Sequence, residues 1–156
     1  MATLVSVCSL SAEENKIQKE LDAYWKEVSR SVGEGDFEGY KATCHEDGVL
    51  VSGKKESSYP LADALKRWKQ EFLDTKAGKI AASVEFRFSN RFHDEATAHE
   101  TGMFLFSATD AEGKKTDAYI HMEALLLKRD GKWQIMMEYQ KSEGTRAEWE
   151  ALAPKK

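Results

Sequence analysis

The chain has 156 residues, of which 41% are hydrophobic and 32% are charged, and its formal net charge is -4. This length and composition are typical of one compact domain that buries a core of its own. Its 23 lysine and arginine residues are outnumbered by 27 aspartate and glutamate residues, and no basic stripe offsets them. Nucleic acid is therefore not an expected partner.

The start of the chain carries the one hint of a targeting segment. Residues 1–12 are mildly apolar, lack the positive start of a signal peptide and are too short to span a membrane. We predict a flexible N-terminus and a cytoplasmic protein that does not associate with membranes. The small residues at 9–12 leave open an alternative, in which the segment is the remnant of an export signal and the protein is exported.

Three amphipathic helices are predicted in the first half of the chain. Ser11 and Glu14 form a capping box, and apolar residues recur behind them at helical spacing. Asp36 is placed to cap a second, shorter helix, whereas Pro60 suits the start of a third, which ends near Gly78. The apolar positions of the three helices are Ile17, Leu21, Tyr24, Trp25, Val28 and Val32, then Phe37, Tyr40 and Cys44, then Leu61, Leu65, Trp68 and Phe72.

The second half changes its hydrophobic period from about 3.6 to 2, which predicts strands. An Asp-Gly turn at Asp130 predicts that the last two strands form a hairpin. Helices followed by antiparallel strands indicate an α+β domain with the helices on one face of the sheet. For the charged tail at 143–156, one or two further helical turns remain an open alternative. The expected strands are 49–51, 84–88, 98–106, 118–127 and 133–140.

Two motifs narrow this order of elements to one superfamily. Residues 35–40 (Gly-Asp-Phe-Glu-Gly-Tyr) resemble the start of the second helix in the association domain of calcium/calmodulin-dependent kinase II. Residues 129–134 (Arg-Asp-Gly-Lys-Trp-Gln) resemble the last hairpin of that domain. The resemblance covers roughly residues 13–142. It implies the nuclear transport factor 2-like superfamily and a SnoaL-like, cystatin-like cone: three N-terminal helices packed on a curved antiparallel sheet.

The same resemblance implies where a site lies. The general base of ketosteroid isomerases falls at Ser52, which cannot serve, and their second oxyanion donor aligns with Glu123. SnoaL-like cyclases use an acidic residue near the end of the last strand, a position that Glu138 matches. The charged triad of limonene epoxide hydrolases aligns loosely with His121, Glu123 and Glu138. We expect these three as catalytic residues, and the pocket walls are expected to include Tyr24, Tyr40, Trp68 and Met136.

The hydrophobic pattern alone favours the opposite arrangement of the strands. It predicts that their apolar faces are buried in the core and that His121, Glu123 and Glu138 are exposed to water. In the family arrangement the polar face points into the cone, and we adopt this arrangement. An enclosed Glu123 without a cationic partner would then have a raised pKa, whereas a neighbouring His121 imidazolium would make the shift smaller or reverse it. The two apolar faces comprise Ile120, Met122, Ala124 and Leu126, and Trp133, Ile135, Met137 and Tyr139.

Three functions remain open. The first is binding of a small, mostly apolar molecule by a homodimer formed through the convex sheet face, since apolar residues on both faces would leave too large a patch in water. The second is a cofactor-independent cyclase, isomerase or hydrolase that uses Glu123, Glu138 and His121. The third is an oligomerisation module like the kinase association domain. No phosphate loop, dinucleotide fingerprint or zinc-ligand spacing occurs, so neither a cofactor nor a metal is expected.

Overall fold

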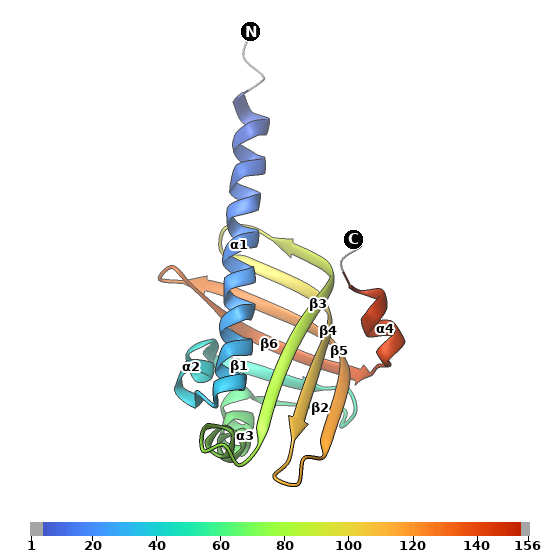
Figure 1. Ribbon diagram of the computed structural model, residues 1–156. Coiled ribbons are helices and arrows are strands. Elements are labelled where there is room, and N and C mark those ends of the chain that lie inside the picture. The colour runs from blue at the N-terminus through green and yellow to red at the C-terminus, as the bar shows by residue number, and fades with distance from the viewer. Residues whose placement is uncertain (1–4, 154–156) are drawn as a thin grey trace.

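A computed structural model describes the backbone of residues 5–153 and the side chains of residues 11–153 (Figure 1). Three helices and two short strands come first in the chain, and four long strands and a last helix follow them. None of the described helices is both long enough and apolar enough to cross a membrane. In chain order the elements are α1 (Val5–Glu34), α2 (Phe37–Ala42), β1 (Cys44–Ser52), β2 (Ser57–Pro60), α3 (Leu61–Lys76), β3 (Ala81–His93), β4 (Thr97–Thr109), β5 (Lys115–Arg129), β6 (Lys132–Glu143) and α4 (Arg146–Ala151).

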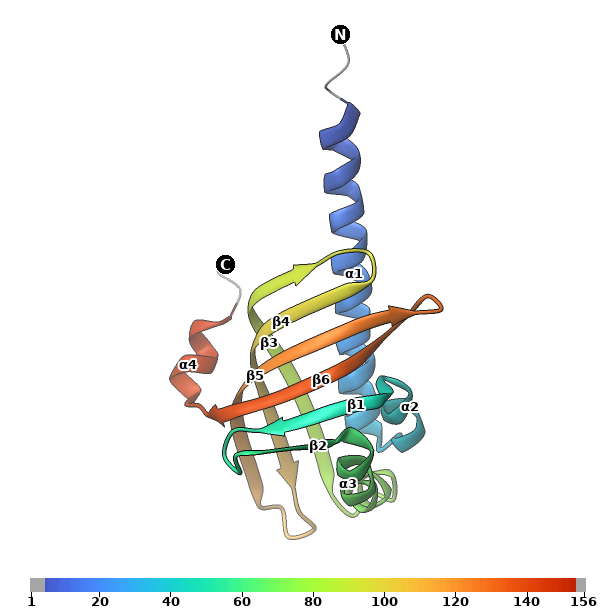
Figure 2. The same ribbon diagram turned by 180° about the vertical axis from the view of Figure 1, so that it is seen from behind.

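The six strands form one curved sheet in the order β2-β1-β6-β5-β4-β3. Neighbouring strands are antiparallel except β1 and β6, which are parallel. The sheet curls around α1, and α2 and α3 lie beside the end of α1 at the base of the cone (Figures 1 and 2). The predicted α+β cone, with three N-terminal helices on a curved sheet, is confirmed.

The turn between α1 and α2 is specified by two adjacent residues. Gly35 has a φ of +66°, and a Cβ at this position would lie 2.4 Å from the carbonyl oxygen of Phe72 on α3. Only glycine allows both the conformation and the close approach. Asp36 then caps α2, because its carboxylate accepts a hydrogen bond from the backbone N–H of Gly39 at 2.9 Å. This turn holds α1 and α2 against α3.

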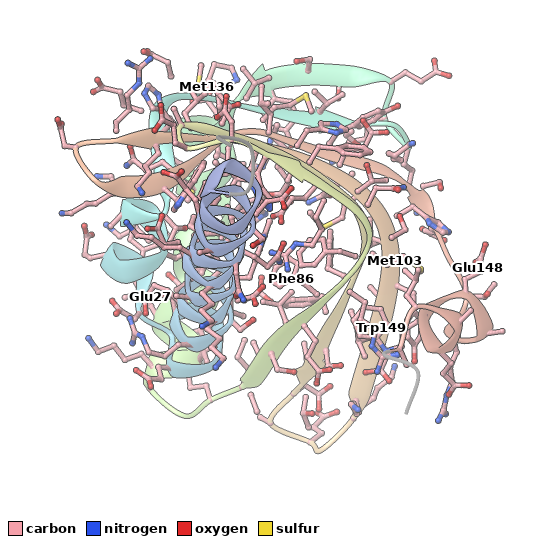
Figure 3. All side chains as sticks on the ribbon, turned by 90° about the horizontal axis from the view of Figure 1, so that it is seen from above. Glu27, Phe86, Met103, Met136, Glu148 and Trp149 are labelled. Atoms are coloured by element: carbon pink, nitrogen blue, oxygen red, sulfur yellow. The ribbon has the colours of Figure 1, made fainter. Side chains whose placement is uncertain are left out.

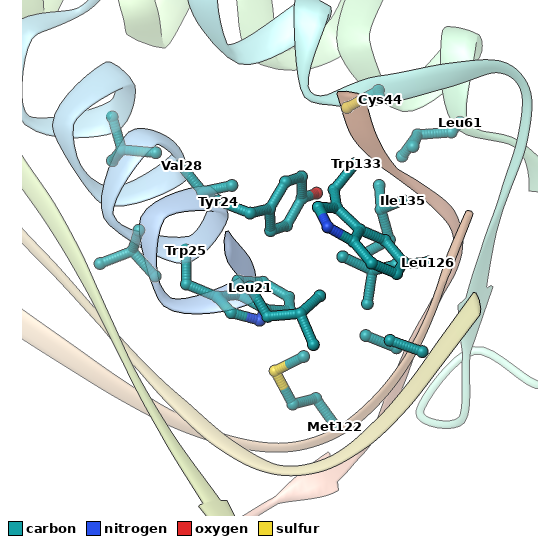
Figure 4. Packing of buried hydrophobic residues seen from close by; sticks show 14 of the residues in the cluster. Leu21, Tyr24, Trp25, Val28, Cys44, Leu61, Met122, Leu126, Trp133 and Ile135 are labelled. Atoms are coloured by element: carbon teal, nitrogen blue, oxygen red, sulfur yellow. The ribbon is translucent and has the colours of Figure 1, made fainter. Parts of the chain in front are cut away.

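The core lies between α1 and the concave face of the sheet (Figure 4). Met122 and Leu126 of β5 are buried there, opposite Leu21 and Trp25 of α1. The apolar face of β5 therefore points into the cone, as the hydrophobic pattern alone indicated. The family arrangement adopted above was wrong for this strand, since burying its aliphatic side chains is favourable whereas burying His121 and Glu123 is costly.

Three local expectations also differ from the structure. Helix α1 begins at Val5 rather than at Ser11, because no glycine or proline interrupts residues 5–10. Cys44 opens β1 instead of lying on the second helix, which ends at Ala42. The four-residue strand β2 was not predicted, since so short a segment ending in a proline gives little periodic signal.

The charged tail folds back on the outer side of the sheet as α4. Trp149 is buried there, with the Arg87 guanidinium 4.2 Å from its ring centroid. The Arg87 Nη1 atom also donates a hydrogen bond of 2.8 Å to the carbonyl oxygen of Trp149. Figure 3 shows Phe86 inside the cone, whereas Met103 and Trp149 lie on the outer side. Helix α4 thus covers one part of the convex face, over β3 to β5.

Candidate functional site

A cavity of about 320 Å³ lies inside the cone, between the three N-terminal helices and the concave face of the sheet. This volume is at the lower end of the range found for small-molecule sites. Most of the wall is apolar, so the cavity suits a small organic molecule. Its aromatic residues are Tyr24, Trp25, Tyr40, Trp68, Phe72, Phe86, Phe104 and Phe106.

Glu138 reaches this cavity because β6 contains a β-bulge at Met136. Ile135 pairs with Leu126 of β5 and Met137 pairs with Leu125, so Met136 has no partner across this strand pair. The extra residue reverses the alternation of side chains along β6. Met137 consequently faces outward, and Glu138 faces inward and lines the cavity. Regular alternation from Trp133 would have placed Glu138 on the outer face.

The environment of Glu138 favours its protonated form. Burial raises the pKa of this carboxyl, and the hydrogen bond from Gln140 opposes the shift to a smaller extent. Gln140 donates that bond through Nε2 to Oε1 at 2.7 Å, and it is the one hydrogen-bond partner of the Glu138 side chain in the described part of the chain. A carboxyl that is enclosed without a cation can act as a hydrogen-bond donor near neutral pH.

Neutral groups surround Glu138 on three other elements. Burial raises the pKa values of Tyr24 on α1 and Tyr40 on α2 well above the usual range, and the nearby Glu138 charge adds to both shifts. Burial also raises the pKa of the Cys44 thiol on β1 to about 12. The Tyr24 hydroxyl donates to the carbonyl oxygen of Thr43 at 3.1 Å. Because the thiol stays protonated, it is no nucleophile, and the polar part of the cavity offers hydrogen bonds rather than a reactive thiolate.

The cavity brings together four of the seven residues expected at the site. Tyr24, Tyr40, Trp68 and Glu138 line it, and their contact with a ligand stays a prediction. Met136 does not line the cavity, because it is the bulged residue.

His121 and Glu123 lie on the outer face, so the expected convergence with Glu138 does not occur. Glu123 accepts a hydrogen bond of 2.6 Å from the Nζ atom of Lys141 and lies 3.4 Å from His99 Nε2. The Lys141 bond is the main cause of a lowered pKa for Glu123. The raised pKa was expected for an enclosed Glu123 without a cationic partner, and this condition is not met. His121 Nε2 lies 3.3 Å from a carboxylate oxygen of Glu148 on α4. These contacts give both side chains partners on the surface.

Two polar residues of the wall, Glu71 and Gln140, were missed from the sequence. Glu71 lies on α3, three residues after Trp68 and next to Phe72, so helical spacing could have identified it. Burial raises its pKa. Gln140 could be found only with Glu138, since the same bulge turns both inward. Within the described residues, no three His, Cys, Asp or Glu side chains are grouped to hold a metal ion.

Glu100 carries a second buried carboxylate, which belongs to a structural network of hydrogen bonds and ion pairs rather than to the cavity. Glu100 is 0% exposed, accepts a hydrogen bond from Nε of Arg91 at 2.5 Å and accepts another from the indole N–H of Trp25. The Nη1 atom of Arg91 also lies 2.5 Å from Asp22 Oδ1. This network ties α1 to β3 and β4. Glu138, in contrast, lies in the cavity without a cationic partner among the described residues.

Substitution of Glu138 by glutamine is expected to stabilise the protein by about 0.5–2 kcal/mol at neutral pH. The unfolded chain releases the Glu138 proton at a lower pH than the folded chain does, so this carboxyl lowers stability as the pH rises above its unfolded pKa. The advantage of the glutamine should therefore disappear below about pH 4. Urea unfolding across this pH range measures it.

Glu123→Gln is the matched control, because its carboxyl has a lowered pKa and a lysine partner. It should be slightly destabilising at neutral pH and neutral in acid. An effect of Glu138→Gln that does not depend on pH would contradict the enclosed, unpaired carboxyl.

Comparison with known proteins agrees with this fold. No curated protein matches the chain. A conserved protein from Planctomyces limnophilus has a TM-score of 0.69 at 11% identity, over 80% of this chain and 94% of its own. An NTF-2 like protein from Shewanella oneidensis has a TM-score of 0.60 at 15% identity, and the match covers 78% of this chain and 96% of that protein. ActVI-ORFA from Streptomyces coelicolor has a TM-score of 0.63 at 16% identity, and the match covers 80% of this chain and 95% of that protein. The model of the calcium/calmodulin dependent protein kinase II association domain matches residues 17–144, and the chain belongs to this family.

Proposed function

We propose that the protein binds a small, mostly apolar molecule in the cone cavity, with Glu138 as its polar contact. The observation that carries the proposal is an aromatic cavity of about 320 Å³ that contains a carboxyl with Gln140 as its described hydrogen-bond partner. Few precisely placed polar groups in an apolar cavity are typical of ligand sites. Gln140 bonds one carboxyl oxygen of Glu138, and a carboxyl group has capacity for further hydrogen bonds, which a polar group of the ligand would use.

Filling the cavity should weaken the binding of a neutral apolar dye. Ala118 lines the cavity from β5, and Ala118→Trp would place an indole ring in this space. N-phenyl-1-naphthylamine, whose fluorescence rises in apolar surroundings, should bind saturably to the wild type and at least about tenfold more weakly to this variant. Lys115→Trp adds the same ring to an exposed position of β5 and should bind the dye as the wild type does. Equal affinity of all three proteins would refute the cavity as the site.

A second candidate is an acid–base enzyme that uses Glu138. The observation in its favour is the raised pKa of this carboxyl beside the neutral hydroxyls of Tyr24 and Tyr40. Such a carboxylate can remove a proton from carbon while a phenol stabilises the resulting enolate. The catalytic set of His121, Glu123 and Glu138 is thereby reduced to Glu138 alone inside the cavity. Deuterium uptake by a cyclic ketone in D₂O, lost in Glu138→Gln, would support this candidate; equal uptake with both proteins would reject it.

We also propose that the protein forms a homodimer through the convex sheet face. The membership in an association-domain family supports assembly. No described helix covers the outer side of β1 and β6 (Figure 2). The face expected to meet the partner, that of Ile120 and Met122, lines the cavity instead. The proposed dimer contact is therefore made by the apolar residues of the opposite, convex face, which comprise Val49, Val51, Leu125, Leu127, Met137 and Tyr139.

A further inference from the structure

The titratable groups on the cavity wall are all acidic or neutral at pH 7. They are the carboxyls of Glu71 and Glu138, the phenols of Tyr24 and Tyr40, and the thiol of Cys44. Among the residues that the structure describes, no lysine, arginine or histidine lines the cavity. An anionic ligand would therefore meet two carboxyls and no compensating cation, whereas a cationic ligand would find a partner.

The nearby cations are engaged elsewhere and cannot turn into the cavity without leaving a carboxylate unpaired. Arg91 is paired with Glu100 and Asp22 behind Trp25. Lys141 follows Gln140 directly in the sequence, yet its Nζ atom lies 2.6 Å from Glu123 on the outer face. Both contacts hold positive charge outside the wall, so the fold leaves the two carboxyls of the cavity without a cationic partner.

The aromatic wall also suits a cation. Tyr40 is in ring contact with Trp68, at a centroid distance of 6.2 Å, and with Phe72, at 5.0 Å. The faces of such rings attract ammonium groups through their quadrupole, most strongly where water is excluded. Tyr40 also lies close enough to Glu138 for its pKa to be affected by that charge. A carboxyl and an aromatic cluster thus share one part of the cavity.

We propose that the cavity selects an apolar amine, bound as the ammonium ion, with its nitrogen at Glu138 and its hydrocarbon part against the aromatic wall. This inference rests on the proposed function and names its ligand class. The ammonium ion takes the place of the proton that the enclosed carboxyl otherwise holds. Binding of an amine should therefore release a proton, and its affinity should rise with pH until Glu138 is ionised in the free protein.

The groups that face Glu138 do not obscure this pH dependence. Tyr24 from α1, Tyr40 from α2 and Cys44 from β1 have raised pKa values and stay neutral, and Gln140 does not titrate. Glu71 from α3 is the other carboxyl of the wall, and its pKa is raised by burial alone. Ionisation of Glu71 favours a cation as well, so the ionisation of either carboxyl raises the affinity for the amine as the pH rises.

Three probes with one ring system test the inference: 1-naphthylmethylamine, 1-naphthalenemethanol and 1-naphthoic acid, which are cationic, neutral and anionic at neutral pH. Calorimetric titration at about pH 8 should show the amine binding at least about tenfold more tightly than the alcohol, and the acid more weakly than both. At about pH 5, where Glu138 is protonated to a larger extent, the preference for the amine should shrink. Glu138→Gln should abolish the preference, whereas Glu123→Gln on the outer face should keep it.

The outcomes separate this inference from the proposed function. If the alcohol or the acid binds as tightly as the amine, the amine is not the ligand class. If Glu138→Gln keeps the preference, Glu138 is not the partner of the amine nitrogen. Either result overturns the inference, while the cavity still binds apolar molecules. If neither these probes nor N-phenyl-1-naphthylamine bind, the proposed function fails together with the inference.

Discussion

Replacement of Arg91 by methionine should lower the free energy of unfolding by about 3–5 kcal/mol. The guanidinium is the charged partner of Glu100, which is 0% exposed. Methionine keeps much of the apolar stem but leaves this carboxylate with the Trp25 N–H as its described partner. A buried charge without its counterion has a large desolvation cost. Urea unfolding of both proteins at neutral pH measures the difference.

Asp22→Asn is the control for the same network. Asp22 pairs with Arg91 at the solvent-exposed end, where its side chain is 53% exposed. An ion pair in contact with water contributes little, so this variant should lose less than about 1 kcal/mol. A small loss for Arg91→Met as well would show that Glu100 does not need the guanidinium to remain buried.

Met137→Glu should separate the proposed homodimer, raising its dissociation constant at least about a hundredfold. Met137 lies on the outer face beside Val49 and Leu125, with which it pairs across the sheet. In a two-fold symmetric contact each substitution is repeated on the partner, so like charges are brought together and desolvated. Met137 is partly exposed in the single chain, so the monomer itself should fold normally. Sedimentation at micromolar concentration distinguishes the two states.

Glu143→Lys provides the comparison for this experiment. Glu143 is exposed at the end of β6, where it pairs with Lys54, and its reversal should leave the sedimentation unchanged. A wild-type protein that sediments at 17.6 kDa, the mass of one chain, would show that the convex face does not associate.

The fold could be predicted because its main elements have strong periodic patterns. The apolar stripe of α1 and the alternation along β5 both describe faces that are buried in the structure. The Asp-Gly turn was equally informative, since Asp130 and Gly131 both have positive φ values, as a tight hairpin turn requires. The segment at 57–60 was missed because four residues are too few to establish a period.

The site could be predicted only in part, and β6 shows why. One bulged residue, Met136, reverses the faces of residues 137–140, and neither composition nor periodicity marks such a bulge. The family resemblance identified Glu138 through its position near the end of the last strand. For His121 and Glu123 the resemblance was misleading, because Lys141 and Glu148 give these two side chains partners on the outer face.

A crystal structure grown with excess N-phenyl-1-naphthylamine shows directly whether the cone holds an apolar ligand. We expect electron density for the dye inside the cone, with its rings between Trp68 and Phe104 and its polar atom toward Glu138. Density at the surface groove between α1 and β3, or an unoccupied cone at a concentration that saturates the fluorescence, would contradict a ligand site inside the cone.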